Sequence, residues 1–150
     1  MELFKLDKNG DGTYTLKGLT DKTVTSVIIP DNVKVIGSAA FYGCNNLTSV
    51  IIPNGVESIG EIAFEHCRKL TSITIPESVK RIEHDAFANC VCLENITVSK
   101  NNTAYHSAEN CIIETATKTL AVGCKNSVIP SDGSVEFIGD CALDATAFIL

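Results

Sequence analysis

The chain has 150 residues, of which 45% are apolar, 20% are charged and 6% are aromatic, and its formal net charge is −6. This composition is too hydrophobic for a disordered chain and lacks the Lys/Arg clusters that nucleic-acid phosphates require, and no apolar run is long enough to span a membrane. Its 42 valine, isoleucine and threonine residues favour β-strands. We therefore expect a soluble, β-rich domain without a nucleic-acid partner or membrane insertion.

Residues 3–22 predict a hairpin at the N-terminus. LFKL and TYTL alternate like strands on either side of DKNGDG, whose Asn-Gly and Asp-Gly pairs favour a tight turn. Such a hairpin would cover the open edge of the element that follows it. The same turn, Asp7–Gly12, matches the first half of a calcium loop. Because Gly18 stands where that loop needs a bidentate glutamate, we expect a plain turn.

A repeat of 23 residues follows the hairpin without gaps. Residues 24–46, 47–69 and 70–92 share the frame L-T-S-V-x-I-P-x-x-V-x-x-I-x-x-x-A-F-x-x-C-x-x. A fourth copy begins at Leu93, departs from the frame, and the frame returns at Ser127 with two extra residues before Val135. We expect one domain, 1–150, made of a cap over 1–23 and repeats over 24–46, 47–69, 70–92, 93–126 with an insertion, and 127–150.

The frame predicts a coil that begins with a short strand. Leu47, Val50 and Ile52 have the L-x-x-L-x-L spacing of inward side chains in a solenoid, and Pro53 ends the strand. Stacked coils would place these strands in a parallel ladder about 4.8 Å apart. The inward stripes are Val24/Leu47/Leu70/Leu93, Val27/Val50/Ile73/Ile96, Ile29/Ile52/Ile75/Val98, Val33/Val56/Val79, Ile36/Ile59/Ile82 and Phe41/Phe64/Phe87.

The alternate strand positions face outward and form a flat, nearly uncharged face. They are mostly small hydroxyl residues with a few aliphatics. The outward positions are Thr25, Ser26, Ile28, Thr48, Ser49, Ile51, Thr71, Ser72, Thr74, Glu94, Asn95 and Thr97.

These copies resemble the BspA-like leucine-rich repeat family, whose units begin L-T-S-I-x-I-P and end A-F-x-x-C. The resemblance covers residues 24–98 closely and 127–146 loosely. It implies a curved leucine-rich repeat solenoid from a bacterial cell-surface or secreted family that binds proteins or adheres to them. It implies no shared catalytic residue. The expected fold is a β-rich parallel strand ladder of about five coils with an N-terminal capping hairpin and a hairpin insertion.

The insertion is predicted to contain a hairpin of CIIE and TLAV separated by TATK, which would extend one coil. It resembles the insertion that many members of the family carry between repeats. The C-terminal segment ATAFIL is unusually apolar for a chain end. Either it packs on the last coil or the natural protein is longer, and the sequence leaves both open.

The seven cysteines fall into two groups. Cys44, Cys67 and Cys90 recur at the repeat period on one inward stripe, where stacked side chains point in parallel. We therefore expect a structural thiol ladder. The other four are not periodic, and a bridge between Cys111 and Cys124 is an open alternative; these four are Cys92, Cys111, Cys124 and Cys141.

No motif for a metal, a cofactor or catalysis converges in this sequence. Cys90-x-Cys92 with His66 or His84 is a loose metal set without a second ligand pair. The three histidines, His106 included, occupy variable positions where we expect exposure. A nucleophile elbow, a phosphate-binding glycine loop and a dinucleotide fingerprint are all absent. We expect neither an enzyme nor a cofactor, and we expect the glycosylation triplets at Asn46 and Asn95 to be incidental because their middle residues are core.

The leading interpretation is a non-enzymatic protein–protein interaction module. Repetition builds an extended surface rather than a pocket, so the partner is expected to be a protein. A structural spacer in a longer cell-surface array is the alternative, because threonine and isoleucine are also simply good strand residues. A sugar-binding surface would want more exposed aromatics than Tyr42 and Tyr105. The outward residues to test are Thr25, Ile28, Thr48, Ile51, Thr71, Thr74 and Thr97.

The sequence leaves two cellular compartments open. The family resemblance points to the cell surface or to secretion. The start MELFKLDKNGDG has no basic segment followed by an apolar one, so no signal peptide is expected in this chain and the cytoplasm stays open.

Overall fold

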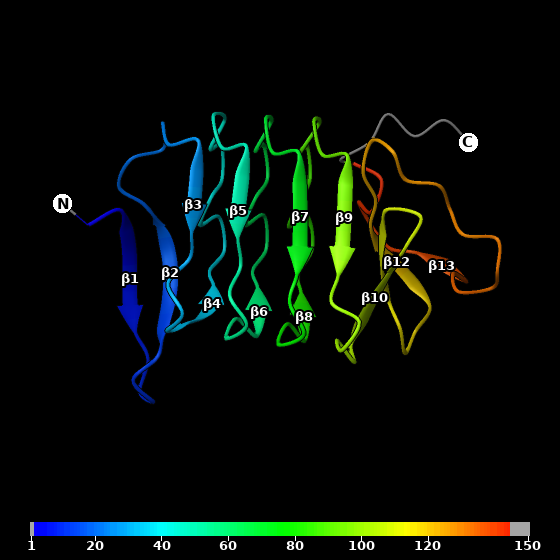
Figure 1. Ribbon diagram of the computed structural model, residues 1–150, viewed down its shortest axis with the longest axis horizontal. Helices are drawn as coiled ribbons and strands as arrows, with labels where there is room; N and C mark the ends of the chain where they lie inside the picture. The colour runs from blue at the N-terminus through cyan, green and yellow to red at the C-terminus, as the bar shows by residue number, and fades with distance from the viewer. Residues whose placement is uncertain (1, 145–150) are drawn as a thin grey trace.

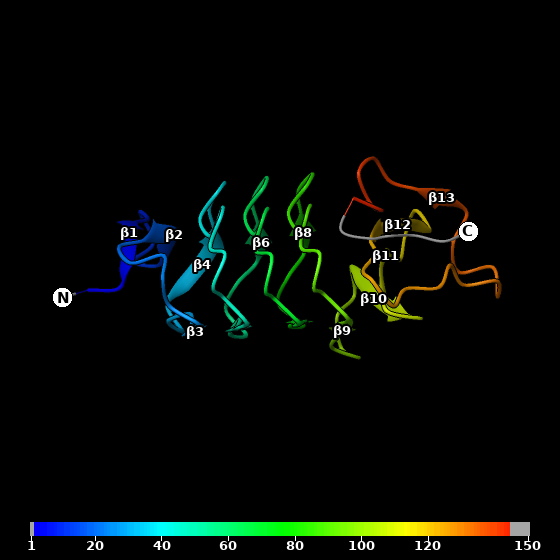
Figure 2. The same cartoon turned by 90° about the horizontal axis from the view of Figure 1, so that it is seen from above.

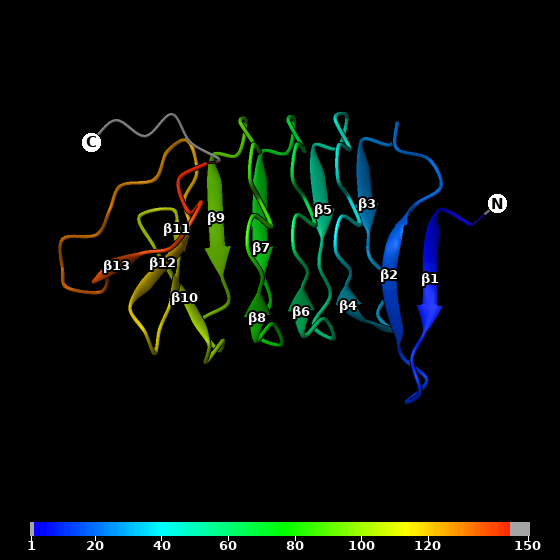
Figure 3. The same cartoon turned by 180° about the vertical axis from the view of Figure 1, so that it is seen from behind.

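The computed structural model describes residues 2–144, which form thirteen short strands and no helix. Figures 1 and 3 show four coils stacked side by side along the long axis of the molecule. A hairpin lies at the N-terminal end of the stack, and a group of strands of different architecture lies at the other end. The β-rich solenoid predicted from the repeat is confirmed.

The first side of each coil is a strand in what we call the front row. It consists of β3 (Ser26–Ile28), β5 (Ser49–Ile51), β7 (Ser72–Ile75) and β9 (Asn95–Val98). Neighbours are parallel and offset by one repeat, so that Val27 lies beside Val50 and Ile73 beside Ile96. β3–β5 and β7–β9 are two separate strand pairs, and between them the main-chain N–H of Thr71, just before β7, donates to the carbonyl of Thr48, just before β5, at 3.3 Å.

The second side of the first three coils forms a back row that the sequence did not indicate. Val56 and Ile59 were predicted to lie on inward stripes, without a strand at either of them. Short parallel strands form here instead, and Figure 2 separates the two rows, with β3 and β9 on one side and the back-row strands on the other. The back row is β4 (Val33–Ile36), β6 (Ser58–Ile59) and β8 (Arg81–Ile82).

The return arm of each coil turns through residues with a left-handed backbone. Ala39, Ile62 and Asp85 occupy the same place in successive repeats and have φ values of 58°, 50° and 57°. Four residues later the turn recurs at Gly43, His66 and Asn89. Only one of these positions is a glycine, so the stack imposes a conformation that L-residues otherwise avoid.

The core lies between the two rows and repeats at each coil. Phe41, Phe64 and Phe87 are stacked, with ring centroids 4.8 and 5.2 Å apart and nearly parallel planes. The predicted inward side chains are buried, with the exceptions of Val24 and Ile82, which are half-buried. Val24 belongs to the first coil and has no repeat before it, and Ile82 belongs to the last back-row strand and has no back-row strand after it.

The N-terminal hairpin joins the back row. β1 (Phe4–Lys8) pairs antiparallel with β2 (Tyr14–Leu19), and β2 pairs parallel with β4. Leu16 and Leu19 are buried in the same cluster as the first coil. The predicted hairpin is therefore present, and it extends the back row by two strands.

The insertion contains three antiparallel strands, one more than the predicted hairpin. They are β10 (Tyr105–Ala108), β11 (Cys111–Glu114) and β12 (Thr119–Val122). Tyr105, expected to be exposed, is buried because its hydroxyl accepts a hydrogen bond from the Ile82 N–H at 2.9 Å.

The expected count of about five coils is corrected to four in the main stack. In the last copy, β13 (Phe137–Ile138) pairs parallel with β12 of the insertion, so the insertion separates this copy from the fourth coil. Its side chains pack in a second, smaller cluster around Ile113, Leu120 and Ala142. The segment ATAFIL falls outside the described residues.

Candidate functional site: the front face

The outward side of the front row is a continuous exposed surface, which we call the front face. Strand alternation buries Val27 and exposes Ile28 on its other side, and each coil repeats this. Ile28 is 69% exposed and Ile51 is 57% exposed, so two aliphatic side chains lie side by side. All seven residues predicted for the binding surface are exposed on this face: Thr25, Ile28, Thr48, Ile51, Thr71, Thr74 and Thr97.

The threonine hydroxyls of the front face differ in what they contact. The Thr48 hydroxyl donates to the Thr25 carbonyl at 2.9 Å, and the Thr71 hydroxyl donates to the Thr48 carbonyl at 3.3 Å. These bonds join neighbouring coils and give the two hydroxyls a structural role. Within residues 2–144 the hydroxyls of Thr74 and Thr97 have no protein partner. Their end of the face therefore offers free donors, and the β3–β5 end offers aliphatic surface.

Charged side chains line the turns beside the front face rather than the face itself. The Asn54 side-chain amide donates to the Glu77 carboxylate at 2.9 Å, one repeat later and just past the strand ends. The Lys69 ammonium donates to the Asn46 side-chain oxygen at 3.3 Å, just before the strands. On the face, Glu94 is the single charged outward position and lies 3.4 Å from the Lys125 ammonium. A partner would consequently meet a nearly uncharged surface with polar borders.

The insertion closes the C-terminal edge of the front row with side chains. The N–H of Ile96 donates to the Asn110 side-chain oxygen at 3.3 Å, and the N–H of Val98 donates to the Ser107 hydroxyl at 3.0 Å. Buried N–H groups left without partners are costly, so these two acceptors replace the strand of a further coil. The front face therefore ends at β9.

The periodic cysteines lie behind the front face in the core. Cys44, Cys67 and Cys90 are fully buried and unpaired. The Cys67 thiol donates to the Phe41 carbonyl and the Cys90 thiol donates to the Phe64 carbonyl, both at 3.1 Å. Burial raises the pKa of the Cys90 thiol to about 12 and raises that of Cys67 further, so both stay protonated at neutral pH.

The remaining cysteines are also unpaired. Cys111 and Cys124 are buried, but they pack in different hydrophobic clusters, and the alternative of a bridge between them is not realised. Cys92 and Cys141 are exposed. The loose metal set is not assembled either, because Cys90 directs its thiol to a buried carbonyl.

The hairpin turn that resembles half of a calcium loop already has partners for Asp11. That carboxylate accepts hydrogen bonds from the N–H and the hydroxyl of Thr13 at 3.0 and 2.6 Å. The Lys34 ammonium lies 3.2 Å away. These contacts lower the pKa of Asp11 to about 2.

Two of the three histidines are less exposed than expected. His66 is half-buried with its ring edge-on to Tyr42, and His106 is hydrogen-bonded to the Thr115 hydroxyl at 2.8 Å. His84 is exposed as expected.

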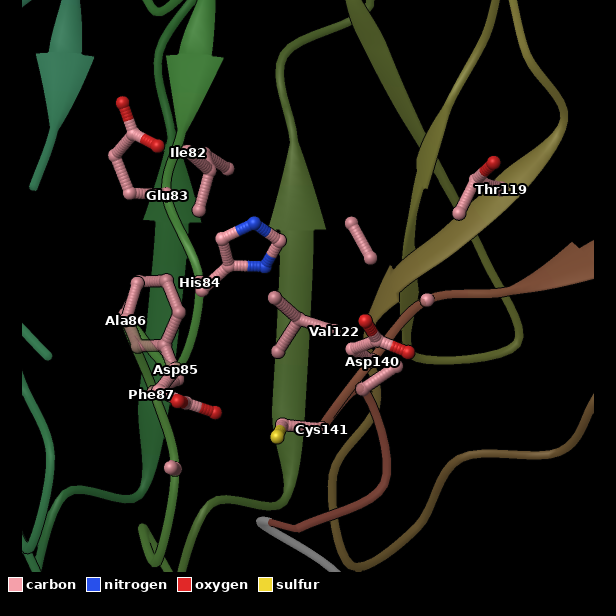
Figure 4. Close-up of a pocket in the computed structure, with 14 residues that line it drawn as sticks. Ile82, Glu83, His84, Asp85, Ala86, Phe87, Thr119, Val122, Asp140 and Cys141 are labelled. Carbon is pink, nitrogen blue, oxygen red and sulfur yellow. The ribbon is translucent and has the colours of Figure 1, made fainter. Parts of the chain in front are cut away.

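One group of polar residues was missed by the sequence analysis. A hollow of about 130 Å³ lies between the third coil and the last copy, and Figure 4 shows His84 and Cys141 facing it from opposite sides. Ligand atoms of Asp85, Cys141 and Asp144 lie within 4.8 Å of one another. A signal did exist, since Cys141 takes the place of Asp85 in the repeat frame and shares its left-handed backbone, with a φ of 58°. The sequence did not indicate that the insertion would bring Cys141 and Asp85 together.

The carboxylates beside Cys141 act on its thiol. Hydrogen bonds to the Asp85 and Asp144 carboxylates raise the pKa of the Cys141 thiol to about 12. The nucleophilic form of cysteine is the thiolate, which is scarce at neutral pH when the pKa is that high. The Cys141 thiol is therefore not activated as a nucleophile.

Comparison with known proteins agrees with the geometry. The model of the BspA type leucine rich repeat region matches residues 17–133 in six copies. The chain belongs to this family. No curated protein matches it. Within residues 2–144 there is no helix with the length and apolar character needed to cross a bilayer.

Solved structures of leucine-rich repeat proteins resemble the chain. A protein from Bacteroides capillosus is 24% identical with a TM-score of 0.64, over 98% of this chain and 90% of that one. A protein from Bacteroides ovatus is 21% identical with a TM-score of 0.49, over 98% of this chain and 56% of that one. A leucine rich cell surface protein from Faecalibacterium prausnitzii is 19% identical with a TM-score of 0.38, over 81% and 60%. The first of these likenesses supports the fold.

Proposed function

We propose that this BspA-type repeat protein is a non-enzymatic module that binds another protein through its front face. The observation that carries the proposal is the nearly uncharged strip across four strands, with Ile28 and Ile51 exposed at one end and free hydroxyls at the other. Exposed aliphatic side chains gathered on one face are typical of protein interaction surfaces. Family membership supports a role in protein interaction.

The cell surface is the proposed compartment, because BspA-like leucine-rich repeat relatives are surface proteins. Adhesion is the matching biological role. The net charge of −6 would also disfavour binding to anionic polymers. We further propose that the buried thiols of Cys44, Cys67 and Cys90 have only a structural role in the stack of coils.

A structural spacer is the second candidate function. The hydrogen bonds from the Thr48 and Thr71 hydroxyls to neighbouring carbonyls favour it, since they give two of the seven surface residues a role without any partner. The two functions differ in whether the exposed side of the strands is in contact with another molecule.

A photo-crosslinking experiment separates the two. A photoreactive residue at position 51 of the full chain, expressed in its source cells, should form discrete adducts with a protein partner. The same residue at Lys80, an exposed position just before β8 in the back row and away from the front face, is the matched control. Adding Thr48→Arg and Thr71→Arg to the first variant should abolish the adducts. Equal adducts from positions 51 and 80, or adducts that survive the two arginines, would contradict the front face as the binding surface.

A further inference from the structure

The two edges of the front row differ in whether their main-chain groups have hydrogen-bond partners. At the C-terminal edge, Asn110 and Ser107 supply acceptors for the N–H groups of β9. At the N-terminal edge, the β1–β2 hairpin pairs with β4 in the back row and leaves β3 as the first strand of the front row. Figure 2 shows this arrangement, with β1 and β2 set back from β3.

The main-chain groups of β3 divide between its two edges. In a parallel ladder, alternate residues direct N–H and C=O to the neighbour on one side. The Thr25 carbonyl accepts from the Thr48 N–H at 2.7 Å, and the Ile29 N–H donates to the Ile51 carbonyl at 3.1 Å. Residues 25, 27 and 29 therefore face β5. Ser26 and Ile28 face the other way, where no protein group among residues 2–144 bonds to them.

The open edge of β3 also lacks the charges that protect other edges. Strand edges in natural proteins are commonly guarded by lysines, which oppose the addition of another strand. β1, the outermost strand of the back row, carries exposed Lys5 and Lys8. β3 carries exposed Ser26 and Ile28 instead, and Ile28 is the most exposed large hydrophobic residue of the structure's described part.

We propose that the outer edge of β3 binds an extended strand of a protein partner by adding it to the front row. The proposal deepens the proposed function, and rests on it only in taking the partner to be a protein. Main-chain hydrogen bonds to Ser26 and Ile28 would supply the affinity, as in other cases of strand addition.

The surroundings of β3 define the chemistry of that strand. On the outward side its side chains would lie beside Ile28, so aliphatic residues fit there. On the inward side Val27 is already covered at the end of the stack, in one cluster with Leu16 and Leu19, so only small side chains fit. A second copy of this chain is disfavoured because both copies would carry a net charge of −6.

The structure itself supplies a probe. β3 lies on the edge of β5 as the guest would lie on β3, so residues 25–30, TSVIIP, define the guest sequence. The probe is the acetylated, amidated peptide TSAIAP, in which the two inward residues are alanine. The control peptide is N-methylated at both alanines, which removes the N–H groups that would be directed to β3.

Titration of the ¹⁵N-labelled full chain with the probe tests the proposal. The amides of Ser26 and Ile28 should shift saturably and exchange with solvent more slowly, and the N-methylated peptide should have no such effect. Ile28→Lys should weaken binding at least about tenfold by placing a charge on the edge. Ile51→Lys, the same exposed position one coil further in, should leave binding nearly unchanged and shows that the fold tolerates the lysine.

Three outcomes would overturn the proposal. The first is the absence of saturable shifts at Ser26 and Ile28 up to millimolar peptide. The second is a set of shifts confined to the Thr48 and Thr71 side of the sheet, which would reject edge addition while supporting the proposed front-face function. The third is protection of the same amides in a concentration-dependent dimer without peptide, which would make a second copy the occupant. Peptide binding together with front-face adducts that survive Thr48→Arg and Thr71→Arg would instead retain the edge and reject the face.

Discussion

The first three repeats and the last copy share one sequence frame, but equivalent positions of the frame are buried to different extents in the two regions. In residues 24–92 the frame isoleucines Ile36 and Ile59 are fully buried between neighbouring coils. Their counterpart in the last copy, Ile138, is 50% exposed, although the sequence around it keeps the same pattern. The difference is one of neighbours, because β13 rests on β12 of the insertion rather than on a back-row strand. Burial in a solenoid is thus a property of the stack more than of the single repeat.

The largest expected effect is on the aromatic stack of the first three repeats. Phe64 lies between Phe41 and Phe87 and is fully buried, so Phe64→Ala should lower the free energy of unfolding by about 3–5 kcal/mol. Urea denaturation followed by circular dichroism measures it. Phe137→Ala in the last copy, where the ring is 61% exposed, should change it by no more than about 0.5 kcal/mol. Similar losses from both would remove the contrast between the two regions.

The next largest expected change in stability is at the junction between the repeats and the insertion. Asn102 is buried, and its amide donates to the Pro76 and Val79 carbonyls at 2.9 Å while its oxygen accepts from the Ala104 and Tyr105 N–H groups. Asn102→Ala should lower the free energy of unfolding by about 2–4 kcal/mol, since each lost bond leaves a buried group unpaired.

The exposed neighbour provides the control for this change. Asn101→Ala should alter the free energy of unfolding by no more than about 0.5 kcal/mol. Hydrogen exchange would locate the effect of Asn102→Ala. We expect β10 and β11 to lose protection from exchange and β5 and β6 to keep theirs. A uniform loss of protection would contradict a local role of Asn102 at this junction.

A smaller effect of opposite sign is expected at the left-handed turns. Ile62 is a β-branched residue with a φ of 50°, a conformation in which asparagine is better tolerated. Ile62→Asn should raise the free energy of unfolding by about 0.5 kcal/mol, because the relief of about 1–2 kcal/mol of strain exceeds the loss of partly buried apolar surface.

The reciprocal change tests the same idea in the same stack. Gly43 has a φ of 67°, and an added Cβ would meet no atom within 4 Å. Gly43→Ala should therefore lower the free energy of unfolding by about 1 kcal/mol through the backbone alone. Thermal denaturation of both variants measures this, and two changes of the same sign would refute the argument from strain.

The smallest effect is at the N-terminal cap and depends on pH. The pKa of Asp11 falls from 3.8 to about 2 through the Thr13 and Lys34 contacts. A carboxyl with a lowered folded-state pKa stabilises the fold above its unfolded pKa and loses that contribution as the pH falls through the folded value. Stability should therefore decline slightly between pH about 4 and 2, and Asp11→Asn should flatten that part of the curve. An unchanged curve would mean that the hairpin turn contributes nothing to acid sensitivity.

Much of the fold could be predicted from the sequence because the signal is repeated. A single strand such as Ser49–Ile51 is too short to identify alone, but three copies with Val50 in register fix its period and its buried side. The exposed positions of the front face follow from the same alternation. The back row was missed because Ser58–Ile59 and Arg81–Ile82 are strands of two residues, which show no alternation.

The remainder depended on contacts that no periodicity encodes. Tyr105 is buried because its hydroxyl meets the end of β8, and Cys141 approaches Asp85 because the insertion displaces the last copy. The open edge of β3 depends on which row the N-terminal hairpin joins. Each of these features depends on the place where a non-repeated segment packs against the repeats. The sequence of such a segment does not reveal that place.

The offset of one repeat between bonded strands has a mechanical consequence. Each inter-coil bond, such as that from the Thr71 N–H to the Thr48 carbonyl, spans 23 residues of chain, so a coil can detach only as a unit. Under a pulling force from its ends, the molecule should lengthen in discrete steps of about 80 Å, the contour of 23 extended residues at roughly 3.5 Å each. A solenoid built in this way should yield one coil at a time while the remaining coils stay folded.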